Sequence, residues 1–142
     1  MRQGLLHAAS ALNAWVYRLS GGRLGARFPS GAPVCLLTTT GRRSGRTRTV
    51  PLLYLTDDGG FVVVASQGGA PQHPGWYHNL QASPNAMLQI GRRRMAVTAN
   101  AIGAEERERL WPRLVALYPP YEGYRRRTTR VIPLVRLAPA GN

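Results

Sequence analysis

Residues 37–54 contain two strand-like runs joined by a short, glycine-bounded loop, and this pattern constrains the fold more than any other stretch. The first run ends in three threonines, and the second is rich in Thr, Val, Leu and Tyr, residue types that favour β-strands. The spacing predicts strands over 33–40 and 47–55. Pro51 predicts an edge strand or a bulge, because proline has no N–H to donate to a neighbouring strand.

The loop between these runs is strongly basic. It carries four arginines and a serine between positions 42 and 48, bracketed by Gly41 and Gly45. Guanidinium groups are always charged and form paired hydrogen bonds to phosphate or carboxylate, and glycine lets backbone N–H groups approach an anion. The first acidic residue of the chain is Asp57. We interpret the loop as a clamp for an anionic cofactor; a solvated hairpin tip is the alternative.

The overall charge restricts the partner classes. The 142 residues carry 19 basic side chains, all of them arginine, against six acidic ones, a net charge of +13. Such a chain is expected to bind nucleic acid, an acidic membrane surface or a phosphorylated small molecule. The arginines cluster in loops rather than along one helix, and no nucleic-acid recognition motif is present. Nucleic acid is therefore the less favoured partner.

The rest of the chain predicts a single α+β domain. Further strand-like runs occur at 61–65, 85–90, 95–102 and 131–137. Helices are predicted at 5–19, 74–83 and 104–118, from the helical spacing of apolar residues or from residues that favour the start of a helix. The turn-forming residues at 56–60 predict a hairpin into the run 61–65, which is continuously apolar and expected to be buried on both faces. Three consecutive antiparallel strands would form a meander, and the whole predicts a small β-barrel with helices outside.

The candidate metal-ligating and reactive groups are few. His7, His73 and His78 have unsuitable spacing and no neighbouring carboxylate cluster, so no metal site is predicted. Cys35, the only cysteine, lies in an apolar run and is predicted to be a buried small hydrophobe. Asp57 and its neighbour Asp58 are predicted to stabilise the turn that they occupy.

The N-terminal segment, residues 1–22, is predicted to form an amphipathic helix. Packing on the core is the favoured interpretation, and docking on a membrane surface is the alternative. No apolar run approaches the roughly 18–20 residues that a membrane span requires. A cytoplasmic location follows as the expectation, with peripheral contact at the inner face of the cell membrane as an option.

Three separated motifs occur in a characteristic order. They read T-T-T-G-R-R-S-G-x-x-R-x-x-P-L-x-Y from Thr38, V-V-V-A-S-x-G-G from Val62, and P-x-W-Y-x-N-L-x-A-x-P from Pro74. In this order the chain resembles the deazaflavin-dependent nitroreductase and quinone reductase family of actinobacteria over about residues 33–137. The resemblance implies a split β-barrel related to flavin-binding pyridoxamine-phosphate-oxidase-like proteins.

The resemblance also implies coenzyme F420, a deazaflavin that carries a phosphate and an oligoglutamate tail, and hydride transfer to a quinone-like, enone or nitroaromatic acceptor. The residues expected to bind the cofactor are Arg42, Arg43, Ser44, Arg48, Pro51, Leu52, Ala65, Ser66, Trp76, Tyr77 and Asn79. The residues expected beside the acceptor are Ser66, Tyr118, Tyr121 and Tyr124. Core packing is the alternative role of the three tyrosines.

Three other functions fit part of this pattern. The basic clamp would accept the phosphate of FMN as well, so an FMN-dependent split-barrel oxidoreductase is the nearest alternative. A nucleic-acid-binding module fits the net charge. A cofactor-binding or membrane-docking protein without catalysis is a further alternative, which bound cofactor without acceptor turnover would favour. The physiological acceptor and the oligomeric state do not follow from the sequence.

Overall fold

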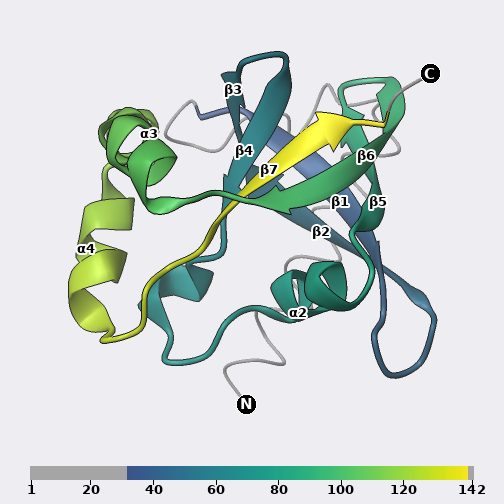
Figure 1. Cartoon of the computed structure of the whole chain (residues 1–142), viewed down its shortest axis with the longest axis horizontal. Coiled ribbons are helices and arrows are strands. Elements are labelled where there is room, and N and C mark those ends of the chain that lie inside the picture. Colours follow the sequence, from purple (N-terminus) through teal and green to yellow (C-terminus); the bar gives the residue numbers. More distant parts are fainter. Residues whose placement is uncertain (1–31, 141–142) are drawn as a thin grey trace.

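The computed structural model describes residues 32–140. The predicted N-terminal helix therefore lies outside the described residues. The strands are β1 (Val34–Thr40), β2 (Thr47–Leu53), β3 (Leu55–Asp57), β4 (Gly60–Val64), β5 (Asn85–Ile90), β6 (Arg93–Ala101) and β7 (Leu134–Pro139) (Figure 1). The helices are the 3-10 helix η1 (Gln67–Gly69) and the α-helices α2 (Gly75–Ala82), α3 (Ala104–Leu117) and α4 (Pro120–Arg127).

All the strands belong to one antiparallel sheet in the order β2-β1-β5-β6-β7-β4-β3. Strands β2 and β3 form the two edges of this sheet, although only Tyr54 separates them in sequence. A sheet whose opposite edges are joined by one residue must curl until those edges approach each other. The result is a half-barrel, which confirms the predicted α+β split-barrel class (Figure 1).

The same connection corrects the prediction of a meander. The hairpins β1–β2 and β3–β4 form as expected, but β2 does not pair with the strand that follows it. The predicted strand 47–55 is two strands, and the chain leaves one edge of the sheet at Leu53 and enters the other at Leu55. Pro51 lies on the edge strand β2 opposite Leu36, as its missing N–H requires.

The structure also contains a helix that was not predicted, and several strand boundaries shift, most clearly that of the last strand. Helix α4 was not anticipated, because its sequence has only a short apolar face and begins at the second of two consecutive prolines. Pro120 occupies its first turn, where proline is well tolerated because the first N–H groups of a helix have no partner within it. The last strand begins at Leu134 rather than at 131, and Val131 is exposed.

The core consists of two apolar clusters on opposite faces of the curled sheet. Alternation along β1 and β4 divides the strands between them: Cys35 and Val63 belong to one cluster, and Val34 and Val62 to the other. This confirms that the strand predicted at 61–65 is buried on both faces. Cys35 is fully buried, as predicted, and burial raises its pKa to about 12, so it is an unreactive thiol.

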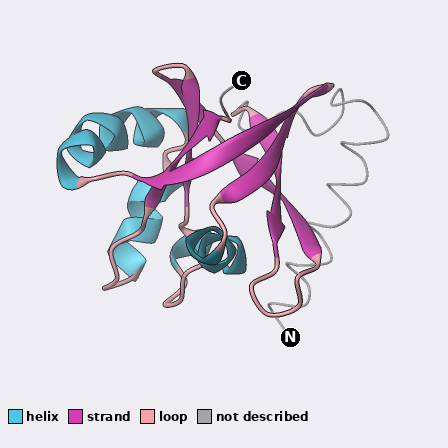
Figure 2. Cartoon of the chain, turned by 45° about the vertical axis from the view of Figure 1, so that its right-hand side comes forward, coloured by secondary structure: helices cyan, strands magenta, loops and turns pink. Residues whose placement is uncertain are grey.

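The helices cover different parts of the sheet. Helices α3 and α4 lie together on one side, and α2 lies apart from them (Figures 1 and 2). The buried residues of α3 and α4 belong to one core cluster, whereas Trp76 and Leu80 of α2 belong to the other. No helix in the described part of the chain is both long and apolar enough to cross a membrane.

Candidate active site

A cavity of about 860 Å³ lies between the β1–β2 loop, η1, α2 and α4. It brings together residues that are widely separated in sequence and come from all three motifs. The predicted site residues that line it are Arg42, Arg43, Ser44, Arg48, Pro51, Leu52, Ser66, Trp76, Asn79, Tyr118, Tyr121 and Tyr124.

Two predicted site residues do not line the cavity. Ala65 is fully buried in the core. The ring of Tyr77 packs instead against His73, with ring centroids 4.9 Å apart, and its hydroxyl accepts a hydrogen bond from Gln81 at 3.2 Å. Their sequence neighbours Ser66 and Trp76 do line the cavity.

The basic loop is closed by its own backbone. The Gly41 N–H donates to the Arg46 carbonyl at 2.7 Å, and the Gly45 N–H donates to the Gly41 carbonyl at 2.8 Å. A Cβ atom on Gly41 would lie 2.9 Å from both the Arg46 carbonyl oxygen and Ser44 Oγ, and Gly45 has a φ of 72°. Both glycines are therefore required by the turn. Ser44 Oγ accepts the Arg46 N–H at 3.2 Å, so this serine shapes the loop as well as lining the cavity.

Asn79 fixes the loop to helix α2. Its Oδ1 accepts hydrogen bonds from the Arg42 backbone N–H at 3.1 Å and from Arg42 Nη1 at 3.2 Å. Its Nδ2 donates to Thr39 Oγ1 at 3.0 Å. Asn79 is 5% exposed and Thr39 is 1% exposed. The asparagine of the third motif thus positions the first arginine of the first motif.

Replacing Asn79 with alanine is expected to lower the free energy of unfolding by about 1–3 kcal/mol, because Thr39 Oγ1 and the Arg42 N–H lose their buried partner. The loop should also become more accessible to trypsin at its arginines. Urea denaturation and limited proteolysis measure the two effects. Asn85→Ala is the matched control, since Asn85 is exposed and its Oδ1 only accepts a 3.4 Å bond from Thr98. Equal stability of the two variants would contradict this role of Asn79.

Ser66 follows β4 after Ala65 and is the N-cap residue of η1. Its hydroxyl does not cap η1 and makes no hydrogen bond to any residue between 32 and 140. Its carbonyl accepts the Gly69 N–H at 2.9 Å and Arg130 Nη2 at 2.8 Å, which fix the backbone. Ser66 lines the cavity, so its hydroxyl can donate to a ligand bound there.

Three tyrosines from the end of α3 and from α4 form another wall. The hydroxyls of Tyr118 and Tyr124 lie 3.2 Å apart, and the rings of Tyr118 and Tyr121 pack edge to face at 5.0 Å. Burial raises the pKa of Tyr121, and burial with the Tyr118 hydrogen bond raises the pKa of Tyr124 to about 12. The phenols of Tyr121 and Tyr124 therefore remain protonated at neutral pH. They can donate hydrogen bonds to an oxygen of a bound ring.

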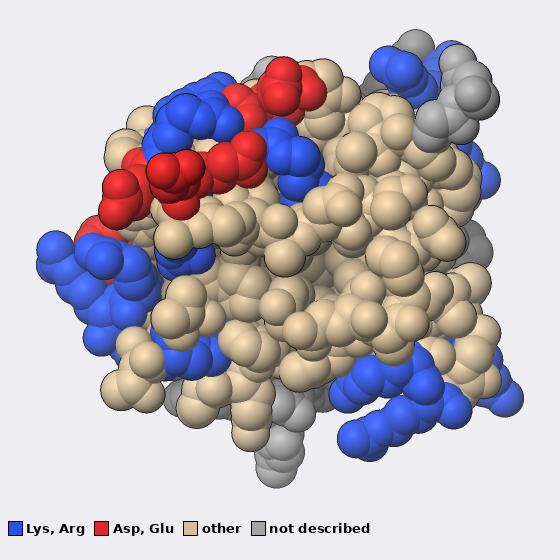
Figure 3. All heavy atoms as spheres, in the orientation of Figure 1, with Lys and Arg blue, Asp and Glu red and all other residues tan. Residues whose placement is uncertain are grey.

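Among residues 32–140, the side chains that line the cavity include positive charges and no negative ones. Arg42, Arg43 and Arg48 line it, and no Asp or Glu does so. All six acidic residues lie instead on the β3–β4 turn, α3 and α4. The space-filling view shows acidic side chains, interspersed with basic ones, in the upper left around α3, away from the basic side chains at the β1–β2 loop in the lower right (Figure 3). The cavity therefore attracts an anionic ligand.

Sequence reasoning missed several residues of the site. The loop before α2 contributes Gln72 and His73, and α2 contributes His78. The two histidine rings lie 5.7 Å apart, and from the sequence they were considered only as metal ligands. Arg130, which holds the Ser66 carbonyl, could not be connected to residues 64 positions earlier by any local pattern.

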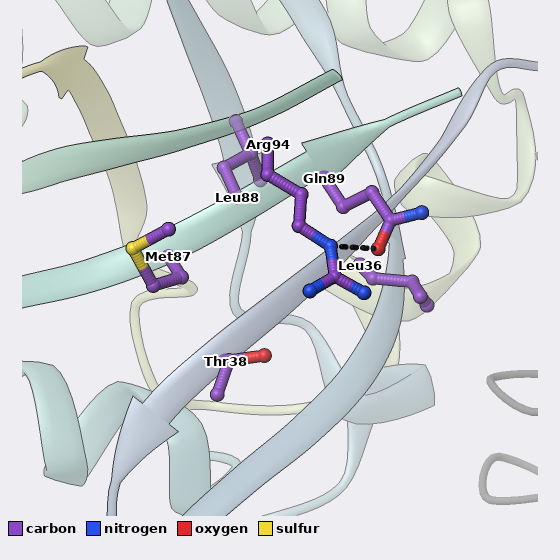
Figure 4. Close-up of a pocket in the computed structure, with 6 residues that line it drawn as sticks. All are labelled: Leu36, Thr38, Met87, Leu88, Gln89 and Arg94. Carbon is purple, nitrogen blue, oxygen red and sulfur yellow. Dashed lines mark hydrogen bonds between the residues drawn. The ribbon is translucent and has the colours of Figure 1, made fainter. Parts of the chain in front are cut away.

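A second hollow, of about 240 Å³, lies on the sheet over β1, β5 and β6 (Figure 4). Its one charged lining residue, Arg94, donates from Nε to Gln89 Oε1 at 3.3 Å. The residues that line it are Leu36, Thr38, Met87, Leu88, Gln89 and Arg94. None of the predicted site residues belongs to this hollow. The described residues contain no group of three or more His, Cys, Asp or Glu side chains that could hold a metal ion.

The curled sheet places the chain in the split-barrel class. The solved structure of a putative pyridoxamine 5′-phosphate oxidase from Listeria innocua shares this fold, with a TM-score of 0.54 and 12% sequence identity over 76% of this chain and 84% of that one. Within this class, the chain belongs to the F420H(2)-dependent quinone reductase family, whose model matches residues 10–139. It is thus an F420H2-dependent oxidoreductase with coenzyme F420 as its cofactor.

Similar proteins of known name support this assignment. An F420H(2)-dependent quinone reductase of Mycobacterium tuberculosis is 40% identical over 86% of this chain and 84% of its own length. A solved F420-H2 dependent reductase has a TM-score of 0.68 and 42% identity over 74% of this chain and 93% of that one. A solved structure described as a domain-swapped dimer has a TM-score of 0.70 and 36% identity over 89% of this chain and 96% of that one.

The cavity fits such a cofactor. Its volume of about 860 Å³ lies within the usual range of ligand sites, about 300–1,000 Å³. Its donors suit the groups of F420, because guanidinium groups match phosphate and carboxylate. Pro51, Leu52 and Trp76 add an apolar surface against which a planar ring can pack.

Proposed function

We propose that this enzyme transfers a hydride from reduced coenzyme F420 to a quinone-like acceptor, and that enones and nitroaromatic compounds are alternative acceptors. One observation carries the proposal: a single cavity is lined by the arginine loop, by Ser66 and by three tyrosines. The β1–β2 loop and α4 lie on opposite sides of α2 (Figures 1 and 2). Cofactor and acceptor can therefore occupy one continuous space.

We assign the anionic part of the cofactor to the arginine loop. Arg43 and Arg48 line the cavity, and their guanidinium groups have no hydrogen-bond partner among residues 32–140, so both are available to phosphate or carboxylate. Arg42 is already oriented by Asn79 and by the Gly75 carbonyl. The Pro51–Leu52 segment and Trp76 would pack against the ring system.

We assign the acceptor to the space beside the tyrosines. Reduced F420, when bound, supplies the hydride. The chain then has to hold the acceptor, exclude water and stabilise the charge that develops on the acceptor oxygen. The hydroxyls of Ser66, Tyr118 and Tyr124 are donors suited to that oxygen, and the ring of Tyr121 supplies apolar contact.

Replacing Ser66 with alanine is expected to lower kcat for quinone reduction by about tenfold or more, because a donor to the developing oxyanion is lost. The binding of oxidised F420 should change much less. Steady-state oxidation of F420H2 by menadione measures the first quantity, and fluorescence titration the second. A variant with full turnover would contradict the role of Ser66.

The choice of acceptor is tested by a direct comparison. Purified enzyme is supplied with F420H2 and, in separate reactions, with menadione, cyclohexenone and a nitroimidazole. The proposal expects kcat/KM to be highest for the quinone. A preference for either of the other compounds would retain the F420-dependent chemistry and reject the quinone as the preferred acceptor, and absence of turnover with all three would reject the proposed reaction.

A further inference from the structure

His73 lines the cavity but has no role in the scheme above. It lies on the loop between η1 and α2, and its ring is confined by two other rings. The Tyr77 ring packs on it edge to face at 4.9 Å, and the His78 ring lies at 5.7 Å. The imidazole is therefore held in place rather than free to rotate.

Arg130 fixes both this histidine and the neighbouring serine. Its guanidinium donates to the carbonyls of Ala65 at 3.2 Å, Ser66 at 2.8 Å and Ala70 at 2.8 Å. Its Nη1 also lies 2.8 Å from His73 Nδ1. One half-buried cation thus links the segment after β4, the η1 turn and the loop that carries His73.

The contact with Arg130 determines which nitrogen of His73 carries the proton. A guanidinium group can only donate hydrogen bonds, so Nδ1 must be the unprotonated acceptor. The proton of the neutral ring is then on Nε2. Burial, the charge of Arg130 and the neighbouring His78 all lower the pKa of His73, which favours this neutral form at neutral pH.

The Nε2–H group is available to a ligand. It makes no hydrogen bond to any residue in the part of the chain that the structure describes. In that same part, every buried side-chain nitrogen and oxygen has a hydrogen-bond partner. Because Nε2 has no such partner, it must be accessible from outside the protein core. His73 lines the cavity, so a ligand bound there can approach this donor.

We propose that His73, held by Arg130 as the neutral Nε2–H tautomer, donates a hydrogen bond to a carbonyl or phenolate oxygen of a planar ring bound in the cavity. The ring belongs either to the cofactor or to the acceptor. This identification of the ring rests on the proposed function, whereas the tautomer of His73 does not. Arg130 is the positioning residue, since it orients His73 and the Ser66 backbone together.

The tautomer is tested on the ligand-free enzyme. Nitrogen NMR of ¹⁵N-histidine-labelled protein at neutral pH distinguishes a protonated from an unprotonated ring nitrogen, and His73→Gln identifies the His73 signals by their loss. We expect Nδ1 to be unprotonated and Nε2 protonated. A protonated Nδ1, in either the other tautomer or the imidazolium, would overturn the proposal. This measurement does not depend on any catalytic activity.

The ligand contact is tested with two matched variants. His73→Phe keeps the ring and removes the donor, whereas His73→Gln retains an N–H donor near the position of Nε2. We expect His73→Phe to raise either the Kd of oxidised F420 or the KM of menadione by about tenfold, and His73→Gln to recover most of the loss. A change in Kd assigns the contact to the cofactor, and a change in KM alone assigns it to the acceptor.

Two results of that comparison would overturn the inference: a folded His73→Phe variant with both constants unchanged, or a His73→Gln variant that loses as much as His73→Phe. If circular dichroism shows that His73→Phe does not fold, His73→Leu replaces it. The NMR test uses the unsubstituted enzyme and does not depend on either variant folding. If the unsubstituted enzyme binds F420 but does not reduce menadione, the proposed function fails while the Kd arm and the tautomer still decide the role of His73.

Discussion

Replacing Arg48 with alanine is expected to weaken the binding of oxidised coenzyme F420 by about tenfold to a hundredfold, because a charge-assisted hydrogen bond to an anion contributes about 1.5–3 kcal/mol. Arg43→Ala should have an effect of the same size. Arg42→Ala should weaken binding at least as much, since its side chain also ties the loop to Asn79. Fluorescence titration at moderate ionic strength measures each Kd.

Arg46 supplies the matched control for these variants. It belongs to the same loop and is exposed, but it does not line the cavity. Arg46→Ala removes the same charge from the same loop, so any general electrostatic attraction is reduced equally. Equal loss of affinity in the Arg46 and Arg48 variants would mean that net charge, and not the cavity, determines binding.

Replacing Asp57 with asparagine is expected to lower the free energy of unfolding by about 1–3 kcal/mol, because charge-assisted hydrogen bonds from three arginines to a buried carboxylate are weakened. The Asp57 carboxylate is almost fully buried and accepts hydrogen bonds from Arg109 at 3.1 and 3.0 Å, Arg113 at 2.7 Å and Arg136 at 3.1 Å. These side chains connect the β3–β4 hairpin to α3 and β7. Urea denaturation of the two proteins measures the difference.

The same carboxylate makes stability depend on pH. Its hydrogen bonds to Arg109 and Arg113 hold the pKa of Asp57 well below its usual range. A group with a lowered folded-state pKa stabilises the protein above its unfolded pKa, and this stabilisation is lost as the pH falls toward the folded value. The free energy of unfolding should therefore decline below about pH 4, and this decline should be much smaller in Asp57→Asn.

Asp58→Asn is the control for both measurements. Asp58 is the exposed neighbour of Asp57 and has a φ of 52°, a conformation that asparagine tolerates well. Its substitution should change stability little at any pH. A loss as large as that of Asp57→Asn would show that the hairpin tolerates no change of charge, rather than that Asp57 has a specific role.

The elements that the sequence predicted well are those determined by local interactions. The β1–β2 hairpin follows from two strand-forming runs and from glycines that the turn geometry requires at 41 and 45. The β3–β4 turn likewise follows from Asp58 and Gly59, both of which have positive φ. In each case, the residues that fix the structure lie within a few positions of one another.

The parts that escaped prediction depend on distant contacts. Nothing near Tyr54 indicates that the chain passes there from one edge of the sheet to the other, since this depends on the curl of the whole sheet. Asp57 was predicted to stabilise its turn, but its partners are 52 to 79 positions away. The pairing of Arg130 with His73 is of the same kind. The family motifs predicted the arginine loop, Ser66 and the tyrosines, whereas the groups that orient them were visible only in the folded chain.

The crystal structure of the complex with oxidised F420 would test the central claim most directly. The account predicts that the phosphate lies within hydrogen-bond distance of Arg43 and Arg48, and that the ring lies in the cavity with one face on the Pro51–Leu52 segment or on Trp76. It also predicts open space between the ring and the three tyrosines, large enough for a quinone. Cofactor density outside the cavity, or a ring that fills the space beside the tyrosines, would contradict the account.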